Sequence, residues 1–129
     1  MASLEYFTAF KKKRGIKAGI GGPLPDSLGN LFMMSWFDVS DNSITGQIPA
    51  AIGDMTNMEY LILNGNSLDG DSPTELGNVG SIKEFYLTNN NLSGRVPKGL
   101  CGLDADIQVD CSVLCLDGCC TDYDLCEAN

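Results

Sequence analysis

The stretch LFMMSWFDVSDNSITGQIP, residues 31–49, is repeated in pattern twice further along the chain. Residues 55–73 read MTNMEYLILNGNSLDGDSP and residues 79–97 read VGSIKEFYLTNNNLSGRVP, so that each stretch begins 24 residues after the one before. Columns of one residue type keep this period: Pro25, Pro49, Pro73 and Pro97; Gly22, Gly46, Gly70 and Gly94; Asn42, Asn66 and Asn90. A fixed period of this length is typical of solenoid proteins, in which each unit buries its apolar face against the next.

Each unit predicts a strand, a corner and a short helical turn. Phe37 and Val39 alternate with outward residues at the period of two that a strand with one buried face shows. The asparagine after each strand suits a place where a buried amide bonds backbone groups of the neighbouring turn. Each proline fixes φ and favours a helical turn. The stretches that follow, such as 50–53, are too short for an α-helix, so we expect 3₁₀ turns.

These columns resemble the plant-type leucine-rich repeat, L-x-x-L-x-x-L-x-L-x-x-N-x-L-x-G-x-I-P-x-x-L-G, over roughly residues 20–111. The chain is similar to extracellular plant and algal proteins of this type and to the ectodomains of leucine-rich-repeat receptor-like kinases. The resemblance implies an α/β fold: a right-handed leucine-rich-repeat solenoid with a parallel β-sheet on the concave face and short 3₁₀ turns on the convex face. Ser72 departs from it, since an apolar residue usually precedes the proline. In the fourth unit Asp106 and Leu114 stand where a core residue and the asparagine belong.

We divide the chain into an irregular N-terminal segment (1–19), the solenoid (20–109) and a cysteine-rich C-terminal cap (110–129). One period before Phe37 and Val39 stand Lys13 and Gly15, which do not read as a strand. Residues 1–19 either form an improvised cap through Tyr6, Phe7 and Phe10 or are the truncated start of a longer repeat protein. We favour truncation, because an uncapped first unit exposes apolar surface.

All six cysteines lie in the last 29 residues: Cys101, Cys111, Cys115, Cys119, Cys120 and Cys126. A set of this kind after a decaying repeat resembles the disulfide-closed caps of secreted leucine-rich-repeat proteins, and this resemblance implies disulfides here. The sequence does not choose among the pairings, although adjacent Cys119 and Cys120 are not expected to bond each other. Zinc is an alternative that fits the spacing poorly, because the chain has no C-x2-C pair and no histidine. Free thiols are a third possibility.

The formal net charge is -9, although five basic residues and one acid occupy the first twenty positions. The acidic remainder repels nucleic acid and favours a basic or neutral partner. No apolar run is long enough to span a bilayer, and the N-terminal residues lack the order of a signal peptide. The disulfides that the resemblance implies indicate an extracellular or cell-surface location. A truncated start reconciles that location with the missing signal.

The outward strand positions predict the ligand-binding residues. They combine aromatic, apolar and acidic side chains: Trp36, Asp38, Tyr60, Ile62, Glu84 and Tyr86. In the fourth unit the 24-residue period places Gln108 and Asp110 in the same two columns. Such a surface suits a protein or peptide ligand, with carbohydrate as a further possibility, and its acids favour basic ligands. The alternative is that the aromatics only stabilise the sheet through cross-strand pairs.

We expect no catalytic residue, cofactor or metal, and therefore not an enzyme. Without histidine, neither a Ser-His nor a Cys-His arrangement exists. Asp38 and Asp110 are expected about 14 Å apart, too far for a glycosidase pair. The aspartates of the tail could hold calcium, but a solvated acidic face explains them better. Asn91-Leu92-Ser93 is an N-glycosylation acceptor pattern. The sequence favours a secreted or cell-surface recognition module; an inhibitor of a cell-wall hydrolase and a structural wall protein are the alternatives.

Overall fold

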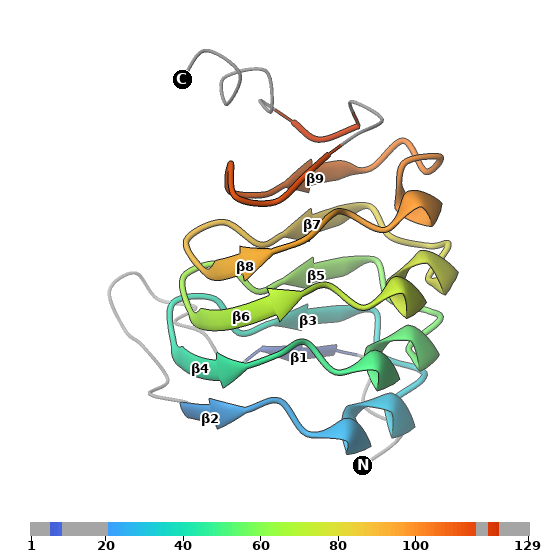
Figure 1. Ribbon diagram of the computed structural model, residues 1–129. Coiled ribbons are helices and arrows are strands. Elements are labelled where there is room, and N and C mark those ends of the chain that lie inside the picture. The colour runs from blue at the N-terminus through green and yellow to red at the C-terminus, as the bar shows by residue number, and fades with distance from the viewer. Residues whose placement is uncertain (1–5, 9–20, 116–118, 122–129) are drawn as a thin grey trace.

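The computed structural model describes residues 6–8, 21–115 and 119–121, and in them the chain winds as a solenoid with a parallel sheet on each of two sides (Figure 1). One sheet has the order β1-β3-β5-β7-β9: β1 Tyr6–Thr8, β3 Trp36–Asp38, β5 Tyr60–Ile62, β7 Glu84–Tyr86 and β9 Asp106–Gln108. The other has the order β2-β4-β6-β8: β2 Gly21–Pro23, β4 Ser43–Gly46, β6 Ser67–Asp71 and β8 Asn91–Ser93. The predicted solenoid is confirmed.

In the described residues, four 3₁₀ helices stack on one another along the side of the solenoid where the chain passes from the second sheet to the first, as predicted (Figure 1). They are η1 Asp26–Asn30, η2 Ala50–Asp54, η3 Thr74–Asn78 and η4 Lys98–Leu100. A proline precedes each helix, and its carbonyl accepts the first helical bond, as from Ile52 N to Pro49 O at 3.1 Å. The turns approach one another so closely that a Cβ added at Gly53 would lie 2.6 Å from Glu75 O. A glycine is therefore required where one turn rests on the next.

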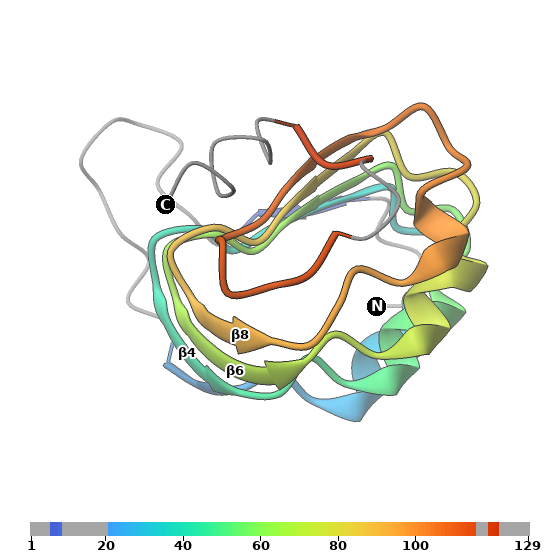
Figure 2. The ribbon, with the colours of Figure 1, turned by 45° about the horizontal axis from the view of Figure 1, so that its top comes forward.

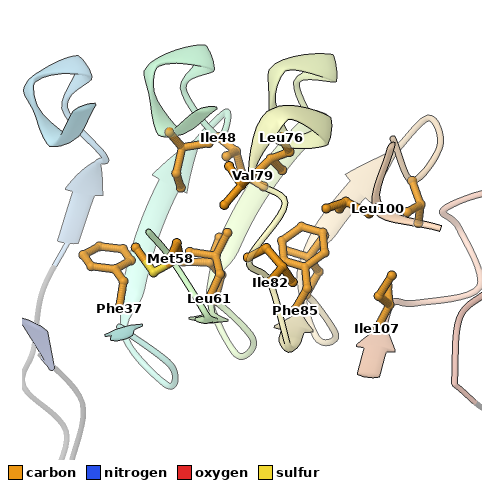
Figure 3. Close-up of a cluster of buried hydrophobic side chains, with 14 of the residues drawn as sticks. Phe37, Ile48, Met58, Leu61, Leu76, Val79, Ile82, Phe85, Leu100 and Ile107 are labelled. Carbon is orange, nitrogen blue, oxygen red and sulfur yellow. The ribbon is translucent and has the colours of Figure 1, made fainter. Parts of the chain in front are cut away.

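The core lies between the five-stranded sheet and the 3₁₀ helices (Figure 3). Phe37, Leu61 and Phe85 point inward from successive strands and are almost fully buried. The methionines of the apolar columns are buried too, so packing explains them. Ser72, the departure noted in the sequence, is 7% exposed, and its hydroxyl has no hydrogen-bond partner.

The asparagines hold successive units together, as predicted. Asn66 donates from Nδ2 to Val39 O (3.0 Å) in the preceding unit and to Leu63 O (3.1 Å) in its own. Its Oδ1 accepts the backbone N–H of Ile44 at 3.0 Å. Asn90 repeats this pattern one unit later, with Leu63 O, Leu87 O and Leu68 N. The amide thus bonds backbone groups that the corner leaves without a ladder partner.

The fourth unit is two residues shorter than the 24-residue period predicted. β9 pairs Asp106 with Glu84 and Gln108 with Tyr86. The placement of Gln108 and Asp110 in the first and second outward columns is therefore wrong by two residues. On the inward side of β9, Ile107 stands opposite Phe85.

The cause lies in the loop before β9. Only residues 104–105 separate Leu103 from β9, whereas residues 80–83 separate Val79 from β7. The shorter loop lacks the buried residue that Met34, Met58 and Ile82 supply in the earlier units. A cavity of about 220 Å³ is found beside this loop, lined by Leu100, Cys101, Asp104, Ala105, Ile107 and Cys119.

The N-terminal segment contains a strand that the repeat did not predict. β1 pairs in parallel with β3, with Phe7 opposite Phe37. It lies 30 residues before β3, so stepping back one period could not find it. The other positions considered there, Phe10, Lys13 and Gly15, lie outside the described residues. Within the described residues no helix is long and apolar enough to cross a membrane.

Candidate functional site

The outward side of the five-stranded sheet carries two columns of side chains, and we call this surface the concave face. The first column is Trp36, Tyr60, Glu84 and Asp106, and the second is Asp38, Ile62, Tyr86 and Gln108. Viewed along the stack, the sheet of β4, β6 and β8 lies across the core from this sheet (Figure 2). The concave face is therefore a separate surface built on rigid, paired backbone.

Two aromatic side chains, exposed Trp36 and half-buried Tyr60, lie side by side on it. Trp36 and Tyr60 are register partners on β3 and β5, and their ring centroids lie 4.6 Å apart with the planes at 36°. Trp36 is 42% exposed. Phe32 and Met33, in the loop just before β3, are also exposed. The strand pairing thus gathers aromatic area where solvent and a ligand can reach it.

Two of the predicted ligand-binding residues are buried. Asp38 is 7% exposed, and its Oδ1 accepts from Ser40 N at 3.0 Å and from Ser40 Oγ at 2.8 Å. Ile62 is 8% exposed. Both therefore support the surface beneath their neighbours and offer little area for contact with a ligand.

A hydrogen-bonded cluster stands at the C-terminal end of the concave face. Asp106 accepts from Tyr86 Oη at 2.7 Å, from Thr121 Oγ1 at 2.6 Å and, more weakly, from Gln108 Nε2 at 3.4 Å. The sequence did not identify Asp106 or Thr121 as site residues. The period assigned Asp106 to the core, and no repeat extends as far as Thr121.

These contacts set the protonation of the cluster. Partial burial, the hydrogen bond to Asp106 and the negative charges of Asp106 and Glu84 raise the pKa of Tyr86 well above its ordinary value of 10.0. The bond from Thr121, aided by those from Tyr86 and Gln108, lowers the pKa of Asp106 although partial burial opposes the shift. Near neutral pH, Tyr86 is therefore a neutral donor and Asp106 an ionised acceptor.

Several other acids of this region already have partners. Glu59 forms an ion pair with Lys83 at 3.2 Å, and both side chains are exposed, so the pair adds little stability. Asp110 accepts the backbone N–H of Asn89 at 3.0 Å and of Asn90 at 3.1 Å, where Asn89 has a φ of 60°. Asp110 thus holds the turn after β7 in place.

Disulfides anchor the C-terminal cap. Cys101 bonds Cys119, and Cys115 bonds Cys120, so the adjacent cysteines do not bond each other, as expected. Cys111 is also disulfide-bonded, and Cys126 lies outside the described residues. The sulfurs of Cys101, Cys115 and Cys119 lie within 4.8 Å of one another, but their disulfide bonds remove the thiolates that zinc needs.

Within the described residues of the cap, Thr121 contacts the concave face. Directly after Cys120, the backbone N–H of Thr121 donates to Ile107 O at 2.7 Å, on the outer edge of β9. Its hydroxyl bonds Asp106, as described above. The disulfides therefore hold a residue of the cap in the cluster at the end of the concave face.

The glycosylation candidate lies on the other sheet. Asn91 is exposed in β8, and Ser93 Oγ donates to Asp71 Oδ1 at 3.1 Å. Asn91 therefore presents its side chain to solvent away from the concave face.

Comparisons with known proteins agree with this geometry. The family model for the leucine rich repeat matches residues 33–104. Among curated proteins, no sequence matches the chain. The crystal structure of PEPR1-AtPEP1 has 28% identity and a TM-score of 0.73, over 84% of this chain and 14% of that one.

Two further solved structures are similar. The ectodomain of the Arabidopsis receptor kinase HAESA, in complex with an IDA peptide hormone ligand, has 30% identity and a TM-score of 0.64 over 72% of this chain and 16% of that one. A plant ice-binding protein has 30% identity and a TM-score of 0.66 over 71% of this chain and 30% of that one. The chain thus spans less than a third of each of these three proteins.

Proposed function

Because the chain belongs to the leucine-rich repeat family, we propose that its concave face recognises a protein or peptide ligand. The observation that carries the proposal is the ring pair of exposed Trp36 and half-buried Tyr60 on paired strands. Aromatic side chains held rigidly contribute much of the binding energy at interfaces, because they bury large area at low entropic cost. The HAESA ectodomain, to which the chain is similar, is in complex with a peptide hormone.

The proposal does not include catalysis by this chain. Asp106 is ionised and already accepts three donors, and Tyr86 holds its proton to high pH. Neither is suited to general acid or base chemistry near neutral pH. With no histidine in the sequence, binding is the function that these residues support best.

We place this recognition outside the cell or at its surface. Disulfide-bonded cysteines persist in oxidising compartments, and Asn91 is exposed, as an N-glycosylated asparagine must be.

Two measurements on protein from its native source test this location. The intact mass should not change on alkylation unless the protein is first reduced. Deglycosylation should lower the mass of the wild type but not of a Ser93→Ala variant. Cysteines that alkylate freely would contradict the location.

Ligand capture tests the binding function. The folded protein, with its disulfides intact, is immobilised and screened with a displayed random dodecapeptide library. We expect enrichment that is lost when Trp36 and Tyr86 are both replaced by alanine, with the circular dichroism spectrum unchanged. Leu114→Ala, which trims an exposed apolar side chain elsewhere, is the matched control and should bind as the wild type does. Equal enrichment by the double variant would refute the concave face as the binding surface.

The alternatives predict different outcomes. An inhibitor of a cell-wall hydrolase would bind the purified hydrolase stoichiometrically and lower its activity. A structural wall protein would retain polysaccharide in a manner insensitive to Trp36→Ala. A carbohydrate ligand of the concave face would be retained by the wild type and lost by that variant.

A further inference from the structure

Two carboxylates stand side by side at the C-terminal end of the first column. Glu84 on β7 and Asp106 on β9 are register partners in a parallel pair, so both project from the concave face at neighbouring positions. Like charges directly opposite each other destabilise a sheet. A cation bound at this end of the column would therefore meet two carboxylates.

Three donors around the pair bond Asp106, and one of them, Tyr86, also lies within hydrogen-bonding reach of Glu84. Tyr86, Thr121 and Gln108 all donate to Asp106. Lys83, the residue next to Glu84 in the chain, pairs with Glu59 instead. In the part of the chain that the structure describes, no cation pairs with Glu84.

We propose that Glu84 binds one cationic side chain, a lysine or an arginine, of the peptide recognised by the concave face. This inference rests on the proposed function and specifies the ligand. A cation at Glu84 would also lie beside Asp106 and beside Tyr60, the register partner on the other side. It would offset the repulsion between the two carboxylates and lie within reach of an aromatic ring.

The other acids of the region are poor alternatives. Asp38 is buried and accepts two bonds from Ser40. Asp110 is occupied by two backbone N–H groups, and Glu59 by Lys83. The net charge of -9 attracts a basic peptide in general. Asp106 shares the partial exposure of Glu84, but three donors already bond its carboxylate, so Glu84 is the better partner for a cation.

The register gives the spacing that the peptide needs. Trp36 and Glu84 stand in one column, two strands apart, and neighbouring strands are about 4.8 Å apart, which places them roughly 10 Å from each other. A peptide in the polyproline II conformation advances about 3.1 Å per residue and presents every third side chain to the same side. An apolar or aromatic side chain on the Trp36–Tyr60 pair therefore falls three residues from the cationic side chain at Glu84.

Selection from the same displayed library tests this inference. The wild type should enrich sequences in which Lys or Arg stands three residues from an aromatic or large aliphatic residue. For one such peptide, Glu84→Gln should weaken binding by about tenfold or more and remove the preference for Lys or Arg over Gln. Glu84→Lys should reverse the charge that the library favours. Glu75→Lys, with the same charge change at an exposed acid on η3, is the control and should keep the basic preference.

The outcomes separate this inference from the proposed function. Peptides that depend on Trp36 but show no basic preference, or a preference that survives in Glu84→Lys, would overturn the role of Glu84 and leave the binding surface standing. A basic preference that Glu75→Lys abolishes as well would reduce the effect to net charge and overturn it too. Enrichment that ignores Trp36 and Tyr86, or no enrichment at all, would overturn both.

Discussion

Ser72 is the residue at which the sequence conflicts most plainly with its surroundings. It stands in a column that is otherwise apolar, with Ile48 one unit before and Val96 one unit after, and its hydroxyl is buried without a partner. Ser72→Val removes the unsatisfied hydroxyl and adds apolar contact, so we expect the free energy of unfolding to rise by about 1 kcal/mol. Urea unfolding measures the change. A loss of stability would instead indicate a buried water bound to this hydroxyl.

The pH dependence of Tyr86 tests the cluster on the concave face. An unfolded chain releases a tyrosine proton near pH 10, whereas the folded protein, with its raised pKa, retains the proton of Tyr86 to higher pH. The stability that Tyr86 contributes is thus complete below about pH 10 and is lost as the pH rises above it.

A difference measurement isolates this single group. We subtract the tyrosinate absorbance of Tyr86→Phe from that of the wild type over a pH titration. This difference reports Tyr86 alone and should show no step near pH 10, because Tyr86 ionises at a higher pH. Urea unfolding should also show the wild type losing stability relative to Tyr86→Phe above about pH 10. A difference spectrum with a midpoint at the ordinary value would mean that Tyr86 does not donate to Asp106.

At the scale of the repeated element, the asparagines decide whether neighbouring units stay in register. Asn66 makes three bonds as donor, the weakest at 3.4 Å to Asn64 O, and one as acceptor, all to backbone groups. In Asn66→Ala these backbone groups lose their partners, and we expect a loss of about 3 kcal/mol in the free energy of unfolding. Asn91→Ala, at an exposed position in β8, is the control and should change it by no more than about 0.5 kcal/mol. Thermal or urea unfolding measures both variants. An equal loss in the free energy of unfolding in Asn66→Ala and Asn91→Ala would contradict this role.

The same periodicity explains how far the sequence could predict the structure. Between residues 34 and 100 each inward column repeats the same burial, so strands β3, β5 and β7, the 3₁₀ turns and the asparagine contacts followed from spacing alone. The pattern could not reveal that the loop before β9 is two residues shorter. Continuing the 24-residue period still places residues of acceptable type in the outward columns, so nothing in the sequence marks the deletion. β1 was missed for a related reason, since its 30-residue distance from β3 breaks the period.

The candidate site was predictable only in part. The strand period identified the outward columns, including Trp36, Tyr60, Glu84 and Tyr86, because alternation alone determines which side chains leave the core. The burial of Asp38 and Ile62 depends on their neighbours on adjacent strands, which alternation does not describe. Thr121 was unpredictable, because disulfides and not a repeat bring it to Asp106.

In the whole molecule, each unit is stabilised by its contacts with the units on either side. Loss of a cap should therefore loosen the chain progressively from that end. The disulfide Cys101–Cys119 closes a loop with a sequence separation of 18, a length for which the chain-entropy account gives about 3 kcal/mol of stabilisation. Together with Cys115–Cys120 it holds Thr121 against Ile107 and Asp106. Reduction should therefore release the edge of β9 before it disturbs β5.

Hydrogen exchange measured by mass spectrometry follows this loss along the chain. On reduction, or in a variant with Cys101→Ala and Cys119→Ala, we expect the amides of β9 and of Thr121 to lose protection first. The amides of β7 should follow, and those of β5 should lose the least. Peptide binding through Glu84 should weaken in parallel, because a loosened β9 no longer holds Asp106 beside Glu84. Equal loss of protection along the whole chain would contradict the unit-by-unit account and would indicate that the solenoid unfolds as a single cooperative body.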